Sequence, residues 1–225
     1  MIVLLSDISS FLSVSPDYDF FKKFPTFRLN SKFSPDIQRS ILSLKLLSIG
    51  LEHYGIKLID ESFSYNQYGK PSISAPKIHF SISHSGKYIV CALSEKNIGV
   101  DIQQNIDDFS DVIDSLNSHE SEYLKTLTNK NELTKNFFNI WTIKESYLKM
   151  IGTGLYKDLN SFYVSLDTHQ LFDDLPVKEV DYRCFSVGDT YTLSVVFNQS
   201  EELSIKYVKL EEHLLPPTIP SNIKQ

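Results

Sequence analysis

The sequence predicts an α+β fold made of two similar halves. A long helical pattern followed by strand-like runs precedes residue 97, and the same order of a helix and then strands recurs after it. Short turns separate successive strand-like runs, which is typical of antiparallel sheets. The segment around Asn97 is not a linker rich in Pro, Gly or Ser, so we expect the halves to pack face to face. Only this layout indicates a duplication, because no sequence repeat relates the halves.

The composition is that of a soluble globular protein. Of the 225 residues, 41% are hydrophobic and 22% are charged, which is too apolar for a disordered chain. The net charge of −6 argues against nucleic-acid binding, which needs a basic surface. An anionic ligand would therefore need a local cluster of Lys, Arg and His side chains.

The N-terminal run and the cysteines indicate a protein of the reducing cytoplasm. The run MIVLLSD predicts an opening strand and not a signal peptide, because no basic residue precedes it and Asp7 interrupts it. No stretch approaches the roughly 20 apolar residues of a membrane span. Cys91 and Cys184 lie in strand-like runs without a CxxC partner, so we expect small buried side chains and not a disulfide or metal pair.

The first half is predicted to hold one long helix. Ser34 stands where a helix cap is expected, and Pro35 stands where the first helical residue is expected. From there apolar residues recur at intervals of three and four as far as Leu51, which is the spacing of one helix face. Arg39 falls on the polar side of this helix, near its start.

Strand patterns follow this helix. Residues 56–65 are strand-like, and a turn follows from Tyr68 to Pro71. Residues 79–95 predict a hairpin in which apolar residues alternate with serines before a turn at Ser85-Gly86. These runs complete the expected sheet of the first half.

The second half opens with a short strand at residues 98–103. Its alternation puts Val100 and Ile102 on one face, and Asp101 and Gln103 on the other. One face of this strand is therefore apolar, while the opposite face carries a carboxylate and an amide.

Helical patterns come next. An acidic, loosely helical segment covers residues 105–117, and a helix with Ser118 and Ser121 as candidate caps covers residues 118–127. Residues 129–133 are predicted as a loop. Further on, strand-like runs occupy residues 161–166, 181–187, 191–197 and 203–210, before a Pro-broken tail.

The stretch from Phe137 to Leu155 predicts the second long helix. It contains no Pro, and its glycines come only at the end, which indicates where the helix stops. Glu145 and Lys149 lie one turn apart, beside an apolar stripe. They could form a helix salt bridge worth roughly 0.2–0.5 kcal/mol, or they could bracket a ligand. The stripe consists of Phe137, Trp141, Leu148 and Ile151, and we expect Trp141 to be a core residue.

Asp101, Glu145 and Lys149 together fit a site for a divalent cation and a phosphate group. Mg²⁺ binds through one or two carboxylates plus substrate phosphate oxygens, and a lysine beside it can neutralise a pyrophosphate. His84 lies in a Ser-His-Ser-Gly turn whose hydroxyls and amides can donate to phosphate. Each residue alone also has an ordinary explanation, such as a strand-edge carboxylate or a surface histidine.

Other catalytic patterns lack essential parts. The sequence contains no GxxxxGK[ST], no GxGxxG after a strand, no GxSxG and no HExxH. Ser83 or Ser85 with His84 does not make a triad, because adjacent residues on a strand point to opposite faces.

Four blocks of sequence carry a resemblance to a known family. In order, the blocks are GKP at 69–71, FSISHSG at 80–86, GVDI at 99–102 and WTIKESYLK at 141–149. Their order and separation resemble the 4′-phosphopantetheinyl transferases of the surfactin-synthetase-activating (Sfp) type. The resemblance covers most of the chain, from Arg39 to the strand at 161–166, and the last two blocks are the most specific.

The resemblance implies two similar α/β subdomains in a pseudo-twofold arrangement, with the active site and coenzyme A at their interface. Residues 1–97 would form the N-terminal half, with the coenzyme A phosphate and adenosine contacts. Residues 98–210 would form the C-terminal half, with the Mg²⁺ site and the active-site helix. Residues 211–225 would be a tail.

The resemblance also implies roles for the residues of the second half. Asp101 and Glu145 would be metal carboxylates, and Glu145 would also be the base for the attacking serine, directly or through water. Lys149 would contact the pyrophosphate. The family usually has a glutamate where this chain has Gln103, so Gln103 would contribute a neutral amide oxygen, in the inner sphere or through water.

Further roles follow for the first half. Ser83 and His84 would contact a phosphate, Lys70-Pro71 would lie beside the adenosine end, and Arg39 would lie near the 3′-phosphate. Glu122 resembles a family glutamate near the active site. The upstream cations Lys22, Lys23, Arg28 and Lys32 are only candidate phosphate partners.

The implied reaction is Mg²⁺-dependent transfer of phosphopantetheine from coenzyme A to a serine of an apo acyl or peptidyl carrier protein, with release of adenosine 3′,5′-bisphosphate. We expect a cytoplasmic monomer that meets its carrier through residues 104–117 and the helix behind them. The sequence does not distinguish fatty-acid, polyketide and nonribosomal-peptide carriers, or free from acylated coenzyme A. One alternative is a non-catalytic carrier-binding relative with a weakened metal site, for which Gln103 is the sole support. A more distant one is another Mg²⁺ enzyme with a nucleotide-like ligand.

Overall fold

The computed structural model describes residues 1–25, 27, 34–75, 77–175, 179–199 and 202–214. Two of the four upstream cations, Arg28 and Lys32, lie outside these residues. The other two follow a short helix, α1 (Tyr18–Phe21), where Lys22 forms an exposed ion pair with Asp19.

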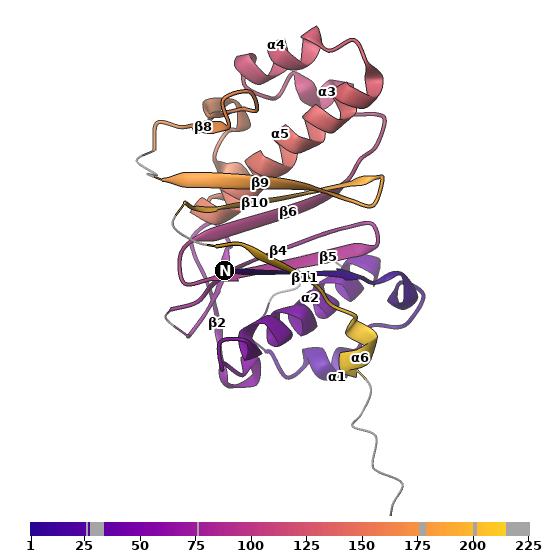
Figure 1. Cartoon of the computed structure of the whole chain (residues 1–225). Helices are drawn as coiled ribbons and strands as arrows, with labels where there is room; N and C mark the ends of the chain where they lie inside the picture. Colours follow the sequence, from indigo (N-terminus) through magenta and orange to yellow (C-terminus); the bar gives the residue numbers. More distant parts are fainter. Residues whose placement is uncertain (26, 28–33, 76, 176–178, 200–201, 215–225) are drawn as a thin grey trace, which may run out of the picture.

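The first sheet combines three strands of the first half with one from the end of the chain. Its order is β11-β1-β5-β4, and only the pairing of β11 with β1 is parallel. Helix α2 packs its apolar residues against this sheet in a large buried cluster (Figure 1). The bounds are β1 Ile2–Asp7, α2 Ser34–Glu52, β4 His79–Ser85, β5 Tyr88–Ser94 and β11 Ser204–Tyr207.

The second sheet is antiparallel, in the order β6-β10-β9. Helix α5 lies on its outer side, so each sheet carries one long helix on the face away from the other sheet (Figure 1). The bounds are β6 Ile98–Gln104, α5 Lys130–Ile151, β9 Val180–Val187 and β10 Tyr191–Asn198.

The two sheets pack face to face. A buried apolar cluster joins residues of β1 and β5 to residues of β6 and β10. Val100 and Ile102 belong to this cluster, as the alternation along the strand predicts, and both are fully buried. The opposite face of β6 is thereby turned toward α5, and this face carries Asp101.

Smaller elements complete the chain. Two short hairpins are formed by β2 (Phe63–Tyr65) with β3 (Pro71–Ile73), and by β7 (Tyr163–Ser165) with β8 (Gln170–Phe172). The short helices are α3 (Ser110–Ile113), α4 (Ser118–Thr126) and α6 (Leu210–Leu214), and 3-10 turns cover Ser9–Phe11, Leu58–Asp60, Gly154–Tyr156 and Leu159–Ser161.

Several boundaries differ from the sequence expectations. The run 56–65 is a strand only at Phe63–Tyr65, because Leu58–Asp60 forms a 3-10 turn. Helix α4 is capped by Asn117 in a capping box with Glu120, and not by Ser118 or Ser121. The predicted loop at 129–133 is the first turn of α5, where the Asn129 side chain accepts two backbone N–H groups.

The end of the chain returns to the first half. Residues 203–210 were expected within the second half, but β11 pairs with β1 and adds a parallel edge strand to the first sheet. Leu210, the first residue of α6, is buried in the cluster beneath α2. The segment therefore joins the halves a second time, and part of the expected tail is helical.

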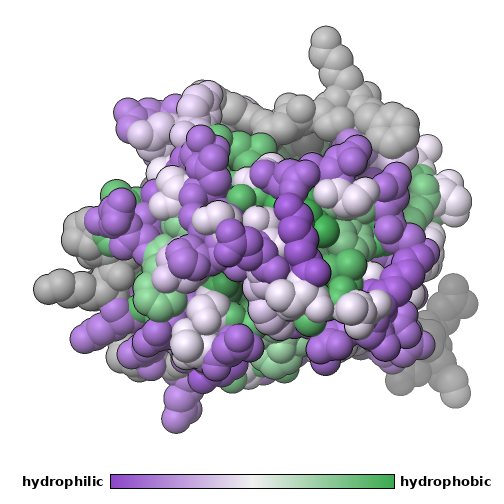
Figure 2. All heavy atoms as spheres, turned by 90° about the horizontal axis from the view of Figure 1, so that it is seen from above, coloured by the Kyte–Doolittle hydropathy of each residue, from purple (hydrophilic) through white to green (hydrophobic). Residues whose placement is uncertain are grey.

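The surface and the cysteines agree with the composition. From the side of α4 and α5, hydrophilic side chains cover most of the surface and hydrophobic ones are scattered among them (Figure 2). Among the described helices, none is long and apolar enough to cross a membrane. Cys91 is buried and Cys184 half-buried, and both are free thiols.

Helix α5 approaches β6 closely because residue 99 has no side chain. A Cβ atom on Gly99 would lie 1.8 Å from the Ser146 carbonyl oxygen and 2.7 Å from the Met150 nitrogen. Two further contacts fix the helix on β10: Ser146 Oγ donates to the Ser194 carbonyl at 2.9 Å, and the Thr142 and Ser194 hydroxyls lie 2.6 Å apart. Gly99 thus allows the short distance between α5 and the second sheet.

We expect Gly99→Ala to lower the free energy of unfolding by about 1–3 kcal/mol, because the methyl group would meet helix backbone. The matched control is Gly50→Ala in α2, where the methyl would meet side-chain atoms of Leu93 and Leu4 and not helix backbone. Denaturant unfolding of both variants checks this prediction. An equal or larger loss for Gly50→Ala would contradict it.

Candidate active site

The candidate site lies where β4, β6 and α5 meet. Three serines of β4 face the edge of β6 and join the two sheets by side-chain hydrogen bonds. Ser81 Oγ accepts from Val100 N at 3.1 Å, and Ser85 Oγ accepts from Gln104 N at 2.9 Å. Between them, Ser83 Oγ donates to Asp101 Oδ1 at 2.6 Å. The period-two serine pattern of the hairpin thus positions β4 beside β6.

Asp101 is the centre of a charged cluster. Its side chain is 1% exposed, and its Oδ1 lies 2.6 Å from Lys149 Nζ. The same ammonium donates to Ser83 Oγ at 2.9 Å. Three residues from β4, β6 and α5, far apart in sequence, therefore meet within hydrogen-bonding distance.

Glu145 lies one turn before Lys149 on α5. Burial raises the pKa of Glu145, the nearby charge of Asp101 raises it further, and Lys149 opposes both effects. No hydrogen bond joins the Glu145 side chain to another described residue. The sequence allowed either a salt bridge between Glu145 and Lys149 or a pair that brackets a ligand. The salt bridge is absent, because Lys149 pairs with Asp101. A half-buried carboxylate with a raised pKa is suited to accept a proton.

Gln103 lies beside Asp101 on the same face of β6. Its Nε2 donates to Asp101 Oδ2 at 3.1 Å. The amide therefore presents its N–H to the carboxylate in this state, and its oxygen is turned away from that contact.

His84 and Arg39 lie on the first-half side of the site. Arg39 Nε donates to the carbonyl of Gly86 at 3.0 Å, and its Nη1 pairs with Asp36 Oδ1 at 3.0 Å. Burial lowers the pKa of His84, and the charges of Arg39 and Lys149 lower it further. The first half thus contributes an arginine that is paired with Asp36, and a histidine with a lowered pKa, next to the Asp101 cluster.

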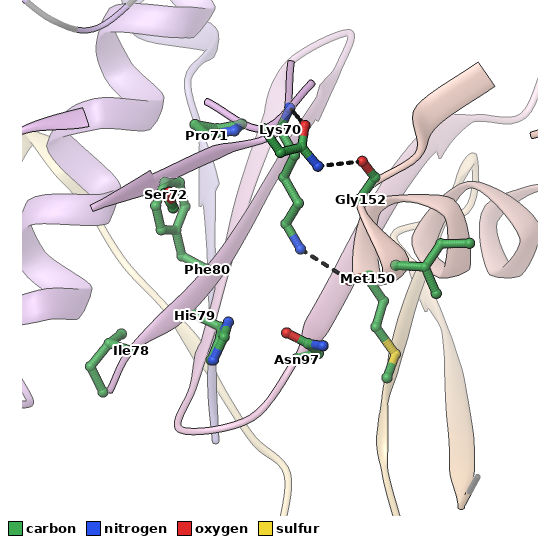
Figure 3. A pocket seen from close by; sticks show the side chains of 11 residues that line it. Lys70, Pro71, Ser72, Ile78, His79, Phe80, Asn97, Met150 and Gly152 are labelled. Carbon is green, nitrogen blue, oxygen red and sulfur yellow. Dashed lines mark hydrogen bonds between the residues drawn. The ribbon is translucent and has the colours of Figure 1, made fainter. Parts of the chain in front are cut away.

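A pocket lies between the turn before β3 and the end of α5 (Figure 3). Lys70 and Pro71 from the first half and Gly152 from the second line it, and Phe80 forms part of its wall. An adjoining pocket shares these residues and extends to Lys149. The second pocket therefore connects the Lys70-Pro71 turn with the Asp101 cluster.

Lys144 and Glu120 are an ion pair that the sequence analysis did not identify. Both side chains are fully buried, and Lys144 Nζ lies 2.7 Å and 2.9 Å from the two Glu120 oxygens. The same ammonium donates to the Phe162 carbonyl at 2.6 Å. Glu122, which resembles a family glutamate near the active site, is exposed on α4. Lys144 directly precedes Glu145, but its pairing depends on a contact between helices that no local pattern reveals.

Trp141 differs from its expected place in the core. It is only partly buried and stacks on Phe137, with ring centroids 6.1 Å apart. At spacings of four it shares a helix face with Glu145 and Lys149. We therefore expect its removal to cost less than the roughly 3–5 kcal/mol of a fully buried Trp.

Comparison with known proteins identifies the family. Residues 97–196 match the model of the 4′-phosphopantetheinyl transferase superfamily, and this range includes Asp101, Glu145 and Lys149. A 4′-phosphopantetheinyl transferase of Bacillus subtilis is 33% identical over 165 residues, which are 71% of this chain and 74% of that protein.

Two further relatives match over shorter stretches. The 4′-phosphopantetheinyl transferase gsp of Aneurinibacillus migulanus is 41% identical over 109 residues, or 48% of this chain and 45% of the relative. The 4′-phosphopantetheinyl transferase Sfp of Bacillus subtilis (strain 168) is 37% identical over 134 residues, or 58% of this chain and 59% of the relative. The matched part thus spans about half the length of these two proteins. The chain belongs to the 4′-phosphopantetheinyl transferase superfamily.

Proposed function

We propose that the protein transfers 4′-phosphopantetheine from coenzyme A to a serine hydroxyl of an apo acyl or peptidyl carrier protein. The observation that carries the proposal is the cluster of Ser83, Asp101, Glu145 and Lys149 at the meeting point of β4, β6 and α5, within a chain of this superfamily. Adenosine 3′,5′-bisphosphate is the leaving group.

The residues around the cluster would bind coenzyme A along the two joined pockets. Lys149 neutralises the pyrophosphate and is already held at the site by Asp101 and Ser83. Ser83 and His84 contact a phosphate, Arg39 lies toward the 3′-phosphate, and the Lys70-Pro71 turn borders the adenosine end. Catalysis then rests on positioning and on charges that are in place before reaction.

Glu145 would take the proton of the attacking serine. The serine oxygen bonds to the phosphorus that carries the pantetheine, and the bond from that phosphorus to the bridging oxygen breaks. The raised pKa of Glu145 makes it a stronger base than an exposed glutamate. Its position one turn from Lys149 puts base and cation on one helix face.

The donor set fits a magnesium ion only together with the substrate. No group of three or more His, Cys, Asp or Glu side chains in the described part of the chain could hold a metal. Asp101 and Glu145 supply two carboxylates, Gln103 can add an amide oxygen, and Mg²⁺ commonly completes its shell with substrate phosphates and water. Bound there, the ion would neutralise charge on the pyrophosphate.

The carrier protein would approach beside the end of β6. Residues 104–117 follow directly after the strand that holds Asp101, and Ile106 in this segment is 54% exposed. We further propose that the protein acts as a cytoplasmic monomer. Its halves would be related by pseudo-twofold symmetry, since each consists of a long helix on a largely antiparallel sheet.

The test is to incubate the protein with coenzyme A, Mg²⁺ and a panel of apo carriers of the three pathway classes. Intact-mass measurement should show one added phosphopantetheine per carrier. A carrier with its acceptor serine changed to alanine is the matched control and should gain nothing. Binding of carriers without any mass increase across the panel would favour the non-catalytic alternative.

The lowered pKa of His84 predicts that coenzyme A binding is linked to proton uptake. The free protein keeps His84 neutral at pH 7, and a phosphate beside it favours the charged form. The pKa of His84 is then higher in the complex than in the free protein. The affinity for coenzyme A should therefore rise as the pH falls through the pKa that His84 has in the complex. Above that pKa the gain in affinity should be absent.

Calorimetry in buffers of different ionisation enthalpy measures this uptake. His84→Gln should take up fewer protons than the wild type on binding coenzyme A at pH 6.5. The comparison removes the contribution of the ligand phosphates, which is the same for both proteins. Equal proton uptake by the two proteins would show that His84 does not contact a phosphate.

A further inference from the structure

The C-terminal end of α5 is held by the first half of the protein. The last carbonyl groups of a helix have no partner within the helix, and here two acceptors near this end receive side-chain donors from the β2–β3 turn. Lys70 Nζ donates to the Met150 carbonyl at 3.1 Å, and Asn66 Nδ2 donates to the Gly152 carbonyl at 2.7 Å. Figure 3 shows Lys70 extended across the pocket toward this helix end.

The turn that carries Lys70 is itself closed by hydrogen bonds. Asn66 Oδ1 accepts the backbone N–H groups of Tyr68 and Lys70, both at 2.9 Å, and Asn66 N donates to the Lys70 carbonyl at 3.1 Å. Gly69 adopts a positive φ of 88°, which a residue with a side chain rarely does. Asn66 thus fixes the turn with its oxygen and the helix end with its nitrogen.

The turn and the helix end are also in close contact. Gly152 ends α5 in the left-handed conformation, with a φ of 78°. A Cβ on this glycine would lie 3.0 Å from both Asn66 Nδ2 and Lys70 Cδ. A cation at a helix C-terminus is favoured by the helix dipole, which offsets the burial that lowers the pKa of Lys70 to about 8.

Lys149 directly precedes Met150, the residue whose carbonyl Lys70 binds. We propose, on the basis of the proposed transfer reaction, that Lys70 is a positioning residue. Its ammonium holds the last turn of α5 against the first half, so that Lys149 and Glu145 stay aligned with Asp101 and Ser83. Its side chain crosses the pocket to reach the helix, and Pro71 beside it also lines the pocket.

The test compares Lys70→Met, which keeps the length of the side chain but loses the donor, with Lys70→Arg, which keeps a donor. Lys77→Met is the matched control, because Lys77 is an exposed lysine in the same half. Lys70→Met should lower kcat by about ten- to hundredfold, since displacement of a catalytic group by about 1 Å costs that much. Lys70→Arg should restore most of the rate, and Lys77→Met should behave as the wild type.

Two readouts separate positioning from ligand contact. The Kd of adenosine 3′,5′-bisphosphate, by calorimetry, should stay within about twofold of wild type in Lys70→Met, and amide hydrogen exchange should quicken at residues 148–154 but not in β6. Two results in Lys70→Met would overturn the proposal. One is a loss of affinity for adenosine 3′,5′-bisphosphate as large as the loss in kcat/KM, with kcat unchanged. The other is unchanged amide hydrogen exchange at residues 148–154. If the wild type modifies no carrier, the proposed function fails, and the exchange comparison still decides the role of Lys70.

Discussion

Replacing Glu145 with Gln is expected to lower the rate of phosphopantetheine transfer by about 10²–10⁴-fold, the usual contribution of a general base. Glutamine has nearly the same shape but cannot accept the serine proton. Glu145 forms no hydrogen bond with another described side chain, and its nearest charged neighbours are Asp101 and Lys149. The fold should therefore survive the substitution.

At a pH above the raised pKa of Glu145, the Glu145→Gln variant should be slightly more stable than the wild type. A glutamate with a raised pKa stabilises the fold below its unfolded-state pKa, and this stabilisation is lost as the pH rises through the folded-state value. The neutral amide does not suffer that loss, so the melting temperature of Glu145→Gln relative to wild type should not fall as the pH is raised. Measurement of carrier mass against time, with excess coenzyme A, gives the rate.

The control for this prediction is Glu132→Gln, an exposed glutamate in the first turn of the same helix. It should transfer at the wild-type rate. Wild-type transfer by Glu145→Gln would remove Glu145 from the mechanism, and unfolding of that variant would show that its carboxylate is structural.

Lys144→Met should lower the free energy of unfolding by about 3–5 kcal/mol, the loss expected when one partner of a buried ion pair is removed. Glu120 would keep its charge inside the protein without the ammonium that lies 2.7 Å away. The loss would also reach other elements, because Glu120 Oε1 accepts from Val164 N at 2.7 Å and Oε2 accepts from Asn117 N at 3.1 Å. One carboxylate thus joins α4, α5 and β7.

A double-mutant cycle with denaturant unfolding measures this coupling. The double variant Lys144→Met with Glu120→Leu should lose less stability than the sum of the single variants, because neither charge is then left unpaired. Lys125→Met is the control, since Lys125 and Asp114 form an exposed pair and its loss should cost about 0–1 kcal/mol. Additive single losses would show that the two side chains do not interact.

The hairpins and long helices could be predicted because their signals are local. Apolar residues alternating with serines in β4, a turn at Ser85-Gly86 and an apolar run in β5 predict the first hairpin, and the period of three to four up to Leu51 predicts α2. The start of α5 was missed because Asn129 is typical both of a loop and of a helix cap. The pairing of β11 with β1 joins the two ends of the chain, and no local pattern encodes it.

The sequence could predict which residues form the site, but not how their side chains contact one another. Asp101 and Lys149 were identified by motifs that a resemblance made meaningful, and the structure brings them together at 2.6 Å. The contact of Lys70 with Met150 and the burial of Lys144 depend on how the halves pack. Gly99 illustrates the difference. Its place in the motif is visible in the sequence, but only the structure shows that a side chain here would collide with the backbone of α5.

We propose that coenzyme A and a divalent ion meet at the cluster of Asp101, Glu145 and Lys149. A crystal structure with coenzyme A and Mn²⁺, in which anomalous scattering locates the ion, tests it most directly. We expect the ion between the carboxylates of Asp101 and Glu145, with Lys149 moved from Asp101 to the pyrophosphate. An ion bound elsewhere, with Lys149 still paired to Asp101 and the pyrophosphate away from both, would contradict it.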